Sequence, residues 1–561
     1  MTIKDIQKSM TSDAIIIFRN NHFWGQDILE QENQILALTG FSGSAGTLII
    51  TRQKAFLFVD GRYEIQSQKQ TNAKFVEVIV ENAENNFQSW IKTNLYNANI
   101  EYNPWQISES LLQQIKKCLP KAQWLPKAQL MNTQRAEAFI QSIDYAGKSA
   151  EDKIAELAQK TASDNVAATF IGAADSVSWL TNLRSNALPD TPIIRAMALV
   201  TAEKAITLLL DNVDLPKECK FKQSSVMTLE NVLQPFSGQK ISADFNTTPA
   251  AIVDICRNLK IEVVNKADFC AVTKAQKNPT ELQGMKNSHI RDGVAVCKFL
   301  SWFEDNYHAK TEIDVVNKLL SLRQEQSLFY SISFETIAGS GENAAIIHYQ
   351  PSASNCAKIK ENSVLLLDSG GQYFDGTTDI TRTISVGNPT LEMIEKFTIV
   401  LKAHIALASQ IFPEHTSGTR LDAICRRIMW QSGLDYKHGT GHGVGCFLNV
   451  HEGPQNMGVS GNNYPLKPNM VVSIEPGYYE EGNFGIRIEN LVYVTHADID
   501  GYLKFEPLTM VPVDFRLIDK YLLTDEEIKW LNNYHHQVYQ KIAPLLSRQE
   551  RQWLEKACSP L

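Results

Sequence analysis

A glycine-rich segment sets the strongest local limit on how this chain can fold. In 438-HGTGHGVG-445, four of the eight residues are glycine and two histidines stand four positions apart. A helix would place His438 and His442 on one face as a metal pair, but each glycine costs a helix about 1 kcal/mol relative to alanine. No glutamate follows the first histidine, as the zinc-protease helix motif requires. The segment is therefore predicted to be a strand or a loop. In a strand, positions i and i+4 share a face, so both imidazoles could line one cavity; the alternative is a flexible loop with incidental histidines.

Length and composition narrow the class of protein. A chain of 561 residues is too long for one hydrophobic core and predicts about three domains. Apolar residues at 43% and charged residues at 21% are typical of a soluble globular protein. The formal charge of −8, without a run of basic residues, argues against nucleic-acid binding.

The targeting signals are equally restrictive. The first residues carry scattered charges and no signal-peptide core, and no apolar run reaches the length of a membrane span, so no membrane partner is expected. Nine cysteines without a C-x-x-C pair indicate free thiols in a reducing compartment. The sequence therefore predicts a cytoplasmic protein.

Two segments in the first half of the chain are similar to each other. Residues 47–63 and 197–213 each show a β-rich run ending in threonine, a short charged turn ending in Lys-Ala, and a second apolar run ending near an aspartate. Both patterns predict β-hairpins. A duplicated α/β domain explains the similarity economically, although two such hairpins can also arise by chance.

Helix starts suggest the domain boundaries. Ser149 is suited to cap a helix that runs to about 160, and Asn278, Pro279 and Glu281 have the arrangement of an N-cap, a first-turn proline and a capping box. The predicted domains are residues 1–145, 146–276 and 277–561. Further amphipathic helices are expected at 391–412, 419–433 and 524–542. His404 is expected to be a packing or surface residue, and His535 and His536 are expected at the surface.

Four acidic residues of the last domain stand next to apolar strand segments, where burial of an acid is energetically costly. Asp368 ends an apolar strand, and the turn at 369–376 can fold Asp379 back beside it by antiparallel pairing. Glu475 ends another apolar run and is held extended by the proline that follows. Glu489 shares one face of a strand with Arg487. Each acid taken singly could equally be a strand end exposed to water.

Convergence of these acids would require cations. Two carboxylates 4 Å apart repel by about 4 kcal/mol at an effective dielectric near 20. With His442 added, the set has four carboxylates and one imidazole, which suits hard or borderline divalent ions rather than a structural zinc site. Two such ions would balance four negative charges and leave room for a bridging hydroxide, the arrangement of two-metal hydrolysis.

The local contexts of these residues resemble a known family. The order LLLDSG, GTTDITRT, HGTGHGVG, EPGYY and GIRIEN is similar to the pita-bread dinuclear metallopeptidases, and specifically to the three-domain aminopeptidase P (Xaa-Pro aminopeptidase) family. GFSGSAG, LFVDGRY, WLTNLR, IIHYQP, FLNVHEGP and WLNNYH extend the resemblance over essentially the whole chain. It implies an α/β fold class, with two similar N-terminal α/β domains of the creatinase N-terminal type followed by a catalytic pita-bread domain.

The resemblance also implies roles for individual residues. Asp379 and Glu489 correspond to the ligands that bridge two ions, and Glu475 also corresponds to the carboxylate that takes the proton from the attacking water. The full implied metal set is Asp368, Asp379, His442, Glu475 and Glu489. The implied catalytic residues are His348, His451 and Glu475, and the implied substrate-binding residues are His348, His438 and His451. Arg487 and Tyr479 look like partners that orient the ligands.

The expected activity follows from this correspondence. The resemblance implies removal of the N-terminal residue from peptides with proline at the second position, by a homodimer holding two divalent ions. Manganese is favoured, and the same ligands accept zinc or cobalt. Three alternatives stay open: a prolidase restricted to Xaa-Pro dipeptides, a metal-independent creatinase-like hydrolase, and a non-catalytic metal-binding interaction protein of the same fold.

Overall fold

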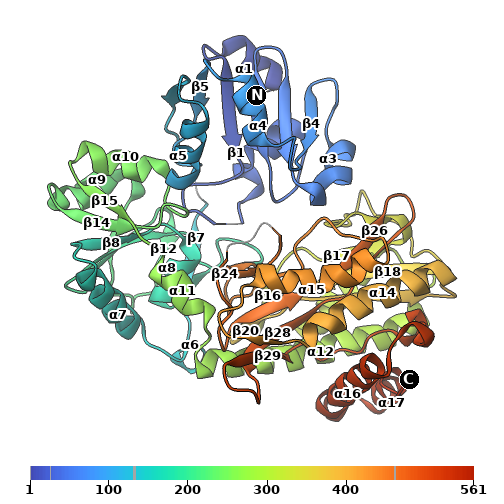
Figure 1. Cartoon of the computed structure of the whole chain (residues 1–561). Helices are drawn as coiled ribbons and strands as arrows, with labels where there is room; N and C mark the ends of the chain where they lie inside the picture. Colours follow the sequence, from blue (N-terminus) through green and yellow to red (C-terminus); the bar gives the residue numbers. More distant parts are fainter. Residues whose placement is uncertain (1, 26, 131–133, 460–462) are drawn as a thin grey trace. The chain divides into compact units, whose positions relative to one another are not determined.

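The protein divides into two compact units, each of mixed α/β structure. The computed structural model describes residues 2–25, 27–130, 134–459 and 463–561. The first unit comprises Met1–Ile143, Lys148–Leu188 and Pro192–Val272, and the second comprises Asp144–Gly147, Pro189–Thr191 and Thr273–Leu561. Figure 1 labels the elements of both units. None of the helices in the described ranges combines the length and apolarity needed to cross a lipid bilayer.

The first unit contains two six-stranded sheets with the same strand pattern. Their orders are β4-β3-β2-β1-β5-β6 and β13-β11-β10-β8-β14-β15. The hairpin strands pair antiparallel with each other, and one of them pairs antiparallel with the next strand, β2 with β1 and β10 with β8. The other three pairings of each sheet are parallel. The predicted hairpins are β2–β3 and β10–β11, so the similarity between 47–63 and 197–213 reflects two similar domains. The strands are β1 Ala14–Phe18, β2 Thr47–Thr51, β3 Ala55–Val59, β4 Val76–Val80, β5 Asn99–Tyr102, β6 Gln123–Pro126, β8 Ala168–Ile171, β10 Met197–Thr201, β11 Ile206–Leu209, β13 Lys222–Ser224, β14 Lys240–Ala243 and β15 Glu262–Asn265.

Helices and a small third sheet complete this unit. The sheet has the order β12-β7-β9, from Val213–Asp214, Ala136–Ile140 and Leu183–Ser185. Ser149 accepts a hydrogen bond from the backbone of Asp152 at the start of α7, as its position in the sequence predicts. The helices are α1 Ile3–Ser9, α2 Gln34–Thr39, α3 Glu64–Gln70, α4 Phe87–Asn94, α5 Glu109–Cys118, α7 Ala150–Ser163, α8 Ala174–Thr181, α9 Leu229–Leu233 and α10 Ala250–Asn258.

The second unit has sheets covered by long helices. Its sheets have the orders β22-β29-β28-β25-β23-β24, β17-β18-β21, β16-β19-β20 and β26-β27. The strands are β16 Phe329–Ile332, β17 Ile337–Ser340, β18 Ser363–Ser369, β19 Gly371–Tyr373, β20 Gly376–Thr377, β21 Ile380–Val386, β22 Ile411–Pro413, β23 Gly441–Gly443, β24 Glu452–Met457, β25 Val471–Ile474, β26 Gly477–Glu480, β27 Phe484–Arg487, β28 Asn490–His496 and β29 Tyr502–Pro507. The helices are α12 Pro279–Asn306, α13 Glu312–Gln324, α14 Leu391–Ala408, α15 Gly418–Gln431, α16 Asp525–Ile542 and α17 Arg548–Ala557.

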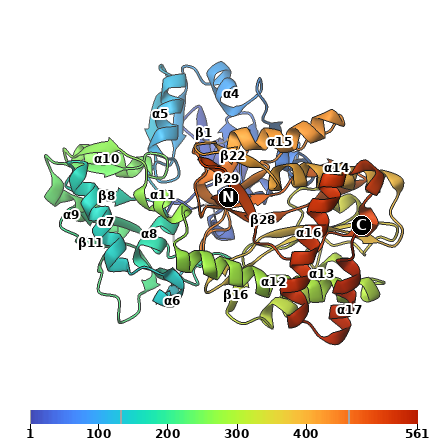
Figure 2. The same cartoon turned by 60° about the horizontal axis from the view of Figure 1, so that its bottom comes forward.

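Two predicted helix starts in this unit are confirmed. Asn278 and Glu281 form the capping box of α12, and Thr524 and Glu527 form that of α16. Figure 2 shows α16 and α17 lying against α12. The surface placement expected for His535 is wrong, because its side chain is buried and its Nε2 accepts a hydrogen bond from the backbone N–H of Val513 at 3.0 Å. His536 is exposed, as expected.

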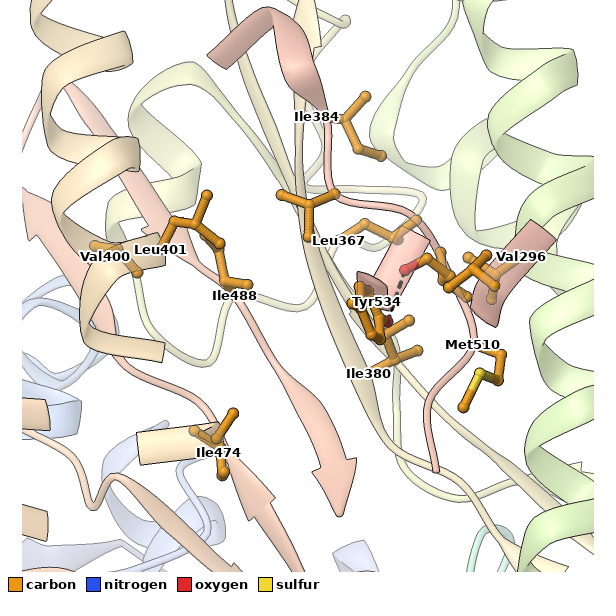
Figure 3. Packing of buried hydrophobic residues seen from close by; sticks show 14 of the residues in the cluster. Val296, Leu367, Ile380, Ile384, Val400, Leu401, Ile474, Ile488, Met510 and Tyr534 are labelled. Atoms are coloured by element: carbon orange, nitrogen blue, oxygen red, sulfur yellow. Dashed lines mark hydrogen bonds between the residues drawn. The ribbon is translucent and has the colours of Figure 1, made fainter. Parts of the chain in front are cut away.

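One hydrophobic core runs through the second unit and fixes the strand ends. Leu367, Ile380, Ile474 and Ile488 are all buried in it together with Val400 and Leu401 of α14 (Figure 3). Each of these first four residues is the immediate neighbour of one of the four acids singled out in the sequence. Because successive residues of an extended chain point to opposite sides, packing of these apolar residues directs the acids away from the core.

A buried charged cluster fixes the start of the second unit to β24. Glu452 Oε2 lies 2.8 Å from Lys274 Nζ and Glu452 Oε1 lies 2.5 Å from Lys277 Nζ, and all three side chains are at most 1% exposed. Removing one member of a buried ion pair leaves an uncompensated charge away from water. This cluster is therefore a point where a single substitution should be costly.

We expect Glu452→Gln to destabilise the protein by about 3–5 kcal/mol, because it leaves two buried ammonium groups without a counter-charge. Thermal and denaturant unfolding would measure the change. The matched control is Glu262→Gln, whose pair with Lys240 is more than half exposed on both sides and should contribute below about 1 kcal/mol. Equal losses of stability in the two variants would contradict this interpretation.

Candidate metal centre

Antiparallel pairing brings the first two acids together. In the pairing of β18 with β21, Asp368 lies opposite Thr381 and Ser369 lies opposite Ile380. Asp379 stands directly before β21 and is 4% exposed, and Asp368 is 8% exposed. The pairing predicted across the 369–376 turn is therefore confirmed. The turn itself contains β19 and β20, which pair with each other and, through β19, with β16.

The imidazole of His442 faces two of the acids. Its Nε2 lies 3.5 Å from Asp379 Oδ2 and 3.5 Å from Glu475 Oε1. Its Nδ1 lies 2.9 Å from the carbonyl oxygen of Gly443. Because a carbonyl can only accept, Nδ1 donates to it, and Nε2 is left on the side of the carboxylates. This is the ring orientation in which a histidine can bind a metal through Nε2.

The glycines beside His442 allow this close approach. A Cβ at Gly441 would lie 1.9 Å from the carbonyl oxygen of Ser473, and one at Gly443 would lie 2.2 Å from that of Glu452. Only glycine therefore lets β23 fit between β24 and β25. The expectation that His438 and His442 share one strand face is wrong, because the strand covers only Gly441–Gly443 and His438 lies on a bend before it.

The two glutamates complete the cluster. Glu475 follows β25, its backbone N–H donates to the carbonyl of Thr440 at 2.8 Å, and its Oε1 accepts from Ser473 Oγ at 3.1 Å. Glu489 lies between β27 and β28, is 1% exposed, and accepts at Oε2 from Thr381 Oγ1 at 2.8 Å. One ligand atom from each of Asp379, His442 and Glu489 lies within 4.8 Å of the other two.

The electrostatics of the cluster favour binding of a positive charge. Burial raises the pKa of Asp379 well above its usual range, and the negative charges of Asp368 and Glu475 raise it further. Burial, followed by the charges of Asp379 and Glu475, likewise raises the pKa of Glu489, and burial raises the pKa of Glu475. Within the described part of the chain, Asp368 Oδ1 and Glu489 Oε1 are buried without a hydrogen-bond partner. Oxygen atoms left in this way, beside the Nε2 atom of His442, form a set that fits divalent cations.

A hydrogen-bonded chain links Asp368 to His438. Arg487 Nη2 donates to Asp368 Oδ2 at 2.6 Å, and Arg487 Nη1 donates to the Tyr479 hydroxyl at 2.7 Å. The hydroxyl lies 2.8 Å from His438 Nε2, while His438 Nδ1 lies 2.8 Å from the carbonyl oxygen of Gly439. The carbonyl fixes the proton on Nδ1, so Tyr479 donates to Nε2. Burial raises the pKa of Tyr479 to about 12, which keeps the hydroxyl protonated for this role.

The remaining two histidines lie at the edge of the cluster. His451 is exposed, and its ring centroid is 4.1 Å from that of His442. His348 is half-buried, and the carbonyl of its neighbour Ile347 accepts from Arg487 Nη2 at 3.4 Å. Among the histidines proposed from the sequence, His451 is thus next to the imidazole of His442. His438 is joined to Asp368 through Tyr479 and Arg487, and His348 follows a residue bound to Arg487.

Thr381 is a member of the site that the sequence analysis did not single out. Its hydroxyl donates to Glu489 and accepts from Arg487 Nε at 3.2 Å, so it joins a candidate ligand to the residue that orients Asp368. The signal was present in GTTDITRT, since Thr381 stands two positions after Asp379 and therefore on the same face of the strand. Ser473, which bonds both Glu475 and the backbone of His442, was missed in the same way.

Comparisons with known proteins cover the whole chain. Residues 283–496 match the model of metallopeptidase family M24, residues 501–561 match the C-terminal region of peptidase M24, and residues 3–136 and 129–281 match creatinase/prolidase N-terminal domains. A probable Xaa-Pro aminopeptidase P of Laccaria bicolor is 37% identical, covering 100% of this chain and 92% of that protein. Aminopeptidase P2 of Arabidopsis thaliana is 36% identical over 98% of this chain and 86% of its own length.

Solved structures agree with the sequence comparisons. The X-prolyl aminopeptidase of Caenorhabditis elegans, described as a cytosolic enzyme with a di-nuclear active site, matches with a TM-score of 0.94 and 30% identity over 100% of this chain and 98% of that one. The prolidase of Pyrococcus horikoshii matches with a TM-score of 0.52 and 22% identity over 64% of this chain, a likeness of fold alone. The chain belongs to metallopeptidase family M24 and, within it, to the aminopeptidase P family, with two creatinase-type N-terminal domains ahead of a pita-bread metallopeptidase domain.

Proposed function

We propose that this protein is an Xaa-Pro aminopeptidase that hydrolyses the peptide bond between an N-terminal residue and a following proline. The observation that carries the proposal is the cluster of Asp368, Asp379, His442, Glu475 and Glu489, in which the three acids other than Glu475 are buried and Nε2 of His442 lies 3.5 Å from Asp379 Oδ2 and from Glu475 Oε1. The full-length likeness to Xaa-Pro aminopeptidase P proteins supports the substrate class.

These five residues would hold two divalent ions. Manganese is the ion we favour from the family, and zinc and cobalt suit the same oxygen and nitrogen donors. When bound, such ions supply Lewis acidity at the scissile carbonyl and make water acidic enough to attack near neutral pH.

The protein's own groups then divide the remaining work. Glu475 would accept the proton of the attacking water and return it to the leaving nitrogen. His348 and His451 would donate hydrogen bonds to the substrate carbonyl as negative charge develops on it. His438 would bind the substrate, its ring orientation fixed by the Gly439 carbonyl and Tyr479.

We also infer a cytoplasmic location and a homodimeric assembly. The nine cysteines all lie within the described part of the chain and form no disulfide there, which agrees with a reducing compartment. The dimer rests on the family resemblance alone.

Release of free arginine from Arg-Pro-Pro is the test of the proposed function. Chelator-treated protein should release none, and added Mn²⁺ should restore release, while Arg-Ala-Ala should stay intact. Cleavage of Arg-Pro in preference to Arg-Pro-Pro would identify a prolidase instead. Release that survives chelation would indicate metal-independent chemistry, and two bound ions with no cleavage of any Xaa-Pro peptide would leave only a binding module.

Stability of the metal-free protein should fall as pH rises. Asp379, Glu475 and Glu489 have raised pKa values in the folded state, so the folded protein binds more protons than the unfolded chain above about pH 4. Their stabilising contribution is therefore complete below the unfolded values and is lost as pH rises through the folded ones, at about 1.4 kcal/mol per pKa unit. Relative to chelated wild type, chelated Asp379→Asn should gain in Tm at pH 8 and not at pH 4. Parallel Tm curves for the two proteins would contradict this account.

Replacement of Arg487 should weaken metal binding. In Arg487→Lys, one ammonium group cannot bond Asp368 and Tyr479 in the fork geometry of the guanidinium, and loss of such an orienting contact costs about 10- to 100-fold in metal affinity or activity. Titration with Mn²⁺ or Co²⁺ would measure the affinity. Arg516→Lys is the matched control. Like Arg487, Arg516 binds an aspartate, in its case through two nitrogens, but its side chain is 46% exposed. Metal affinity should change less than about twofold in that variant. An equal loss of affinity in both variants would contradict the orienting role assigned to Arg487.

A further inference from the structure

A buried polar network lies behind the strands that carry the candidate ligands. Its members are Arg382 of β21, His404 of α14, Asn490 of β28 and Tyr534 of α16, and each is at most 3% exposed. None of them belongs to the set of residues proposed above to bind metal or substrate. Buried polar groups are costly to retain in a core, so a network of four needs an explanation.

Arg382 binds the backbone of a candidate ligand. Its Nη1 donates to the carbonyl oxygen of Glu489 at 2.6 Å and to that of Thr381 at 2.9 Å. Its Nε and Nη2 reach the carbonyls of Pro512 and Val511 at 3.0 and 2.8 Å. Among the described residues, no carboxylate forms an ion pair with it, so its charge is satisfied by backbone carbonyls. The guanidinium thus fixes where the Glu489 backbone lies.

His404 lies between the two strands that lead to the glutamates. Its Nδ1 lies 3.1 Å from the carbonyl oxygen of Ile474, the residue before Glu475. The carbonyl of Ile488, the residue before Glu489, also faces the imidazole. Burial, assisted by the charge of Arg382, lowers the pKa of His404 to about 3, so the ring is neutral and bonds these strands without adding charge.

Asn490 joins the two halves of the network. Its Nδ2 lies 3.4 Å from His404 Nε2, and its Oδ1 accepts from Arg382 Nη2 at 2.8 Å. The Tyr534 hydroxyl lies 3.0 Å from Arg382 Nη2 and 3.3 Å from Asn490 Oδ1. A continuous path of hydrogen bonds therefore runs from the C-terminal helix α16 to the backbone carbonyls of Ile474, which precedes Glu475, and of Glu489.

We propose that Arg382, His404, Asn490 and Tyr534 form a positioning network for the metal centre. It holds the backbones of Glu475 and Glu489 at the separation that two ions require, and it connects them to α14 and α16, which lie outside the ligand strands. The proposal rests on the metal centre of the proposed function, but not on the peptide that is cleaved. A network that only satisfied core polar groups would affect folding stability without affecting metal binding.

The test compares two buried histidines of the same unit. His404→Leu removes the bonds to the ligand strands at similar side-chain volume. His289→Leu is the matched control, because His289 is also buried and neutral, with its pKa lowered to about 4, but its Nδ1 bonds the carbonyl of Met285 in its own helix. Both variants should lose thermal stability. Only His404→Leu should lose Co²⁺ affinity, by about 10-fold or more, with an altered Co²⁺ absorption spectrum that reports changed coordination.

Each outcome of this experiment decides between the two explanations. Unchanged Co²⁺ affinity and spectrum in folded His404→Leu, or equal losses of affinity in both variants, would overturn the network. If His404→Leu does not fold, Tyr534→Phe removes one hydroxyl from the network and takes its place, and wild-type affinity in that variant would overturn the proposal. Wild-type protein that binds no Co²⁺ would refute the metal centre itself, whereas metal binding without peptide cleavage would refute only the proposed substrate.

Discussion

The mutual repulsion of four buried carboxylates is the constraint on which the second unit depends. Such a cluster cannot exist unless the chain forces the acids together and something of opposite charge then balances them. The force comes from the hydrophobic core: Leu367, Ile380, Ile474 and Ile488 each pack inward, and each holds an adjacent acid on the opposite side of its strand. The core therefore holds the acids together against their mutual repulsion, and bound cations would reduce that repulsion.

Local rules account for the parts of the fold that could be predicted from the sequence. The caps at Ser149, Asn278 and Thr524 depend on side chains that reach only three residues along the chain, and all three are present. The hairpins and the pairing of β18 with β21 depend on short turns between apolar runs, and these also formed as expected. Four of the five candidate ligands could be found because acids at the ends of apolar strands contradict the usual pattern of burial, and His442 could be found from the glycines around it. Their assignment as metal ligands rests on resemblance and donor chemistry.

The predictions that failed depend on contacts between distant segments. His535 has the context of an exposed helical residue, and only its bond to Val513, 22 positions away, explains its burial. The expectation that His438 and His442 share one strand face failed because β23 begins only at Gly441 and is three residues long. Its length is set by its pairing with β24 and β25. The role of Thr381 depends on Glu489 and Arg487, more than 100 residues away. No local pattern carries this information, so the polar partners of the site were the least predictable part of it.

The C-terminal helix follows from the same reasoning about buried polar groups. The segment Leu508–Val513 passes behind the ligand strands without regular pairing along its length, so its carbonyls and N–H groups need other partners. The side chains of α16 supply them, since the Tyr534 hydroxyl lies 3.0 and 2.8 Å from the carbonyl oxygens of Thr509 and Val511, and His535 accepts from Val513. Arg382 binds the carbonyls of Val511 and Pro512 from the opposite side and that of Glu489 with the same guanidinium. Without α16, this segment would leave buried polar groups unpaired next to Glu489, a candidate metal ligand. The strands therefore supply the ligands, while the helices that cover them supply the hydrogen bonds that keep those ligands in place.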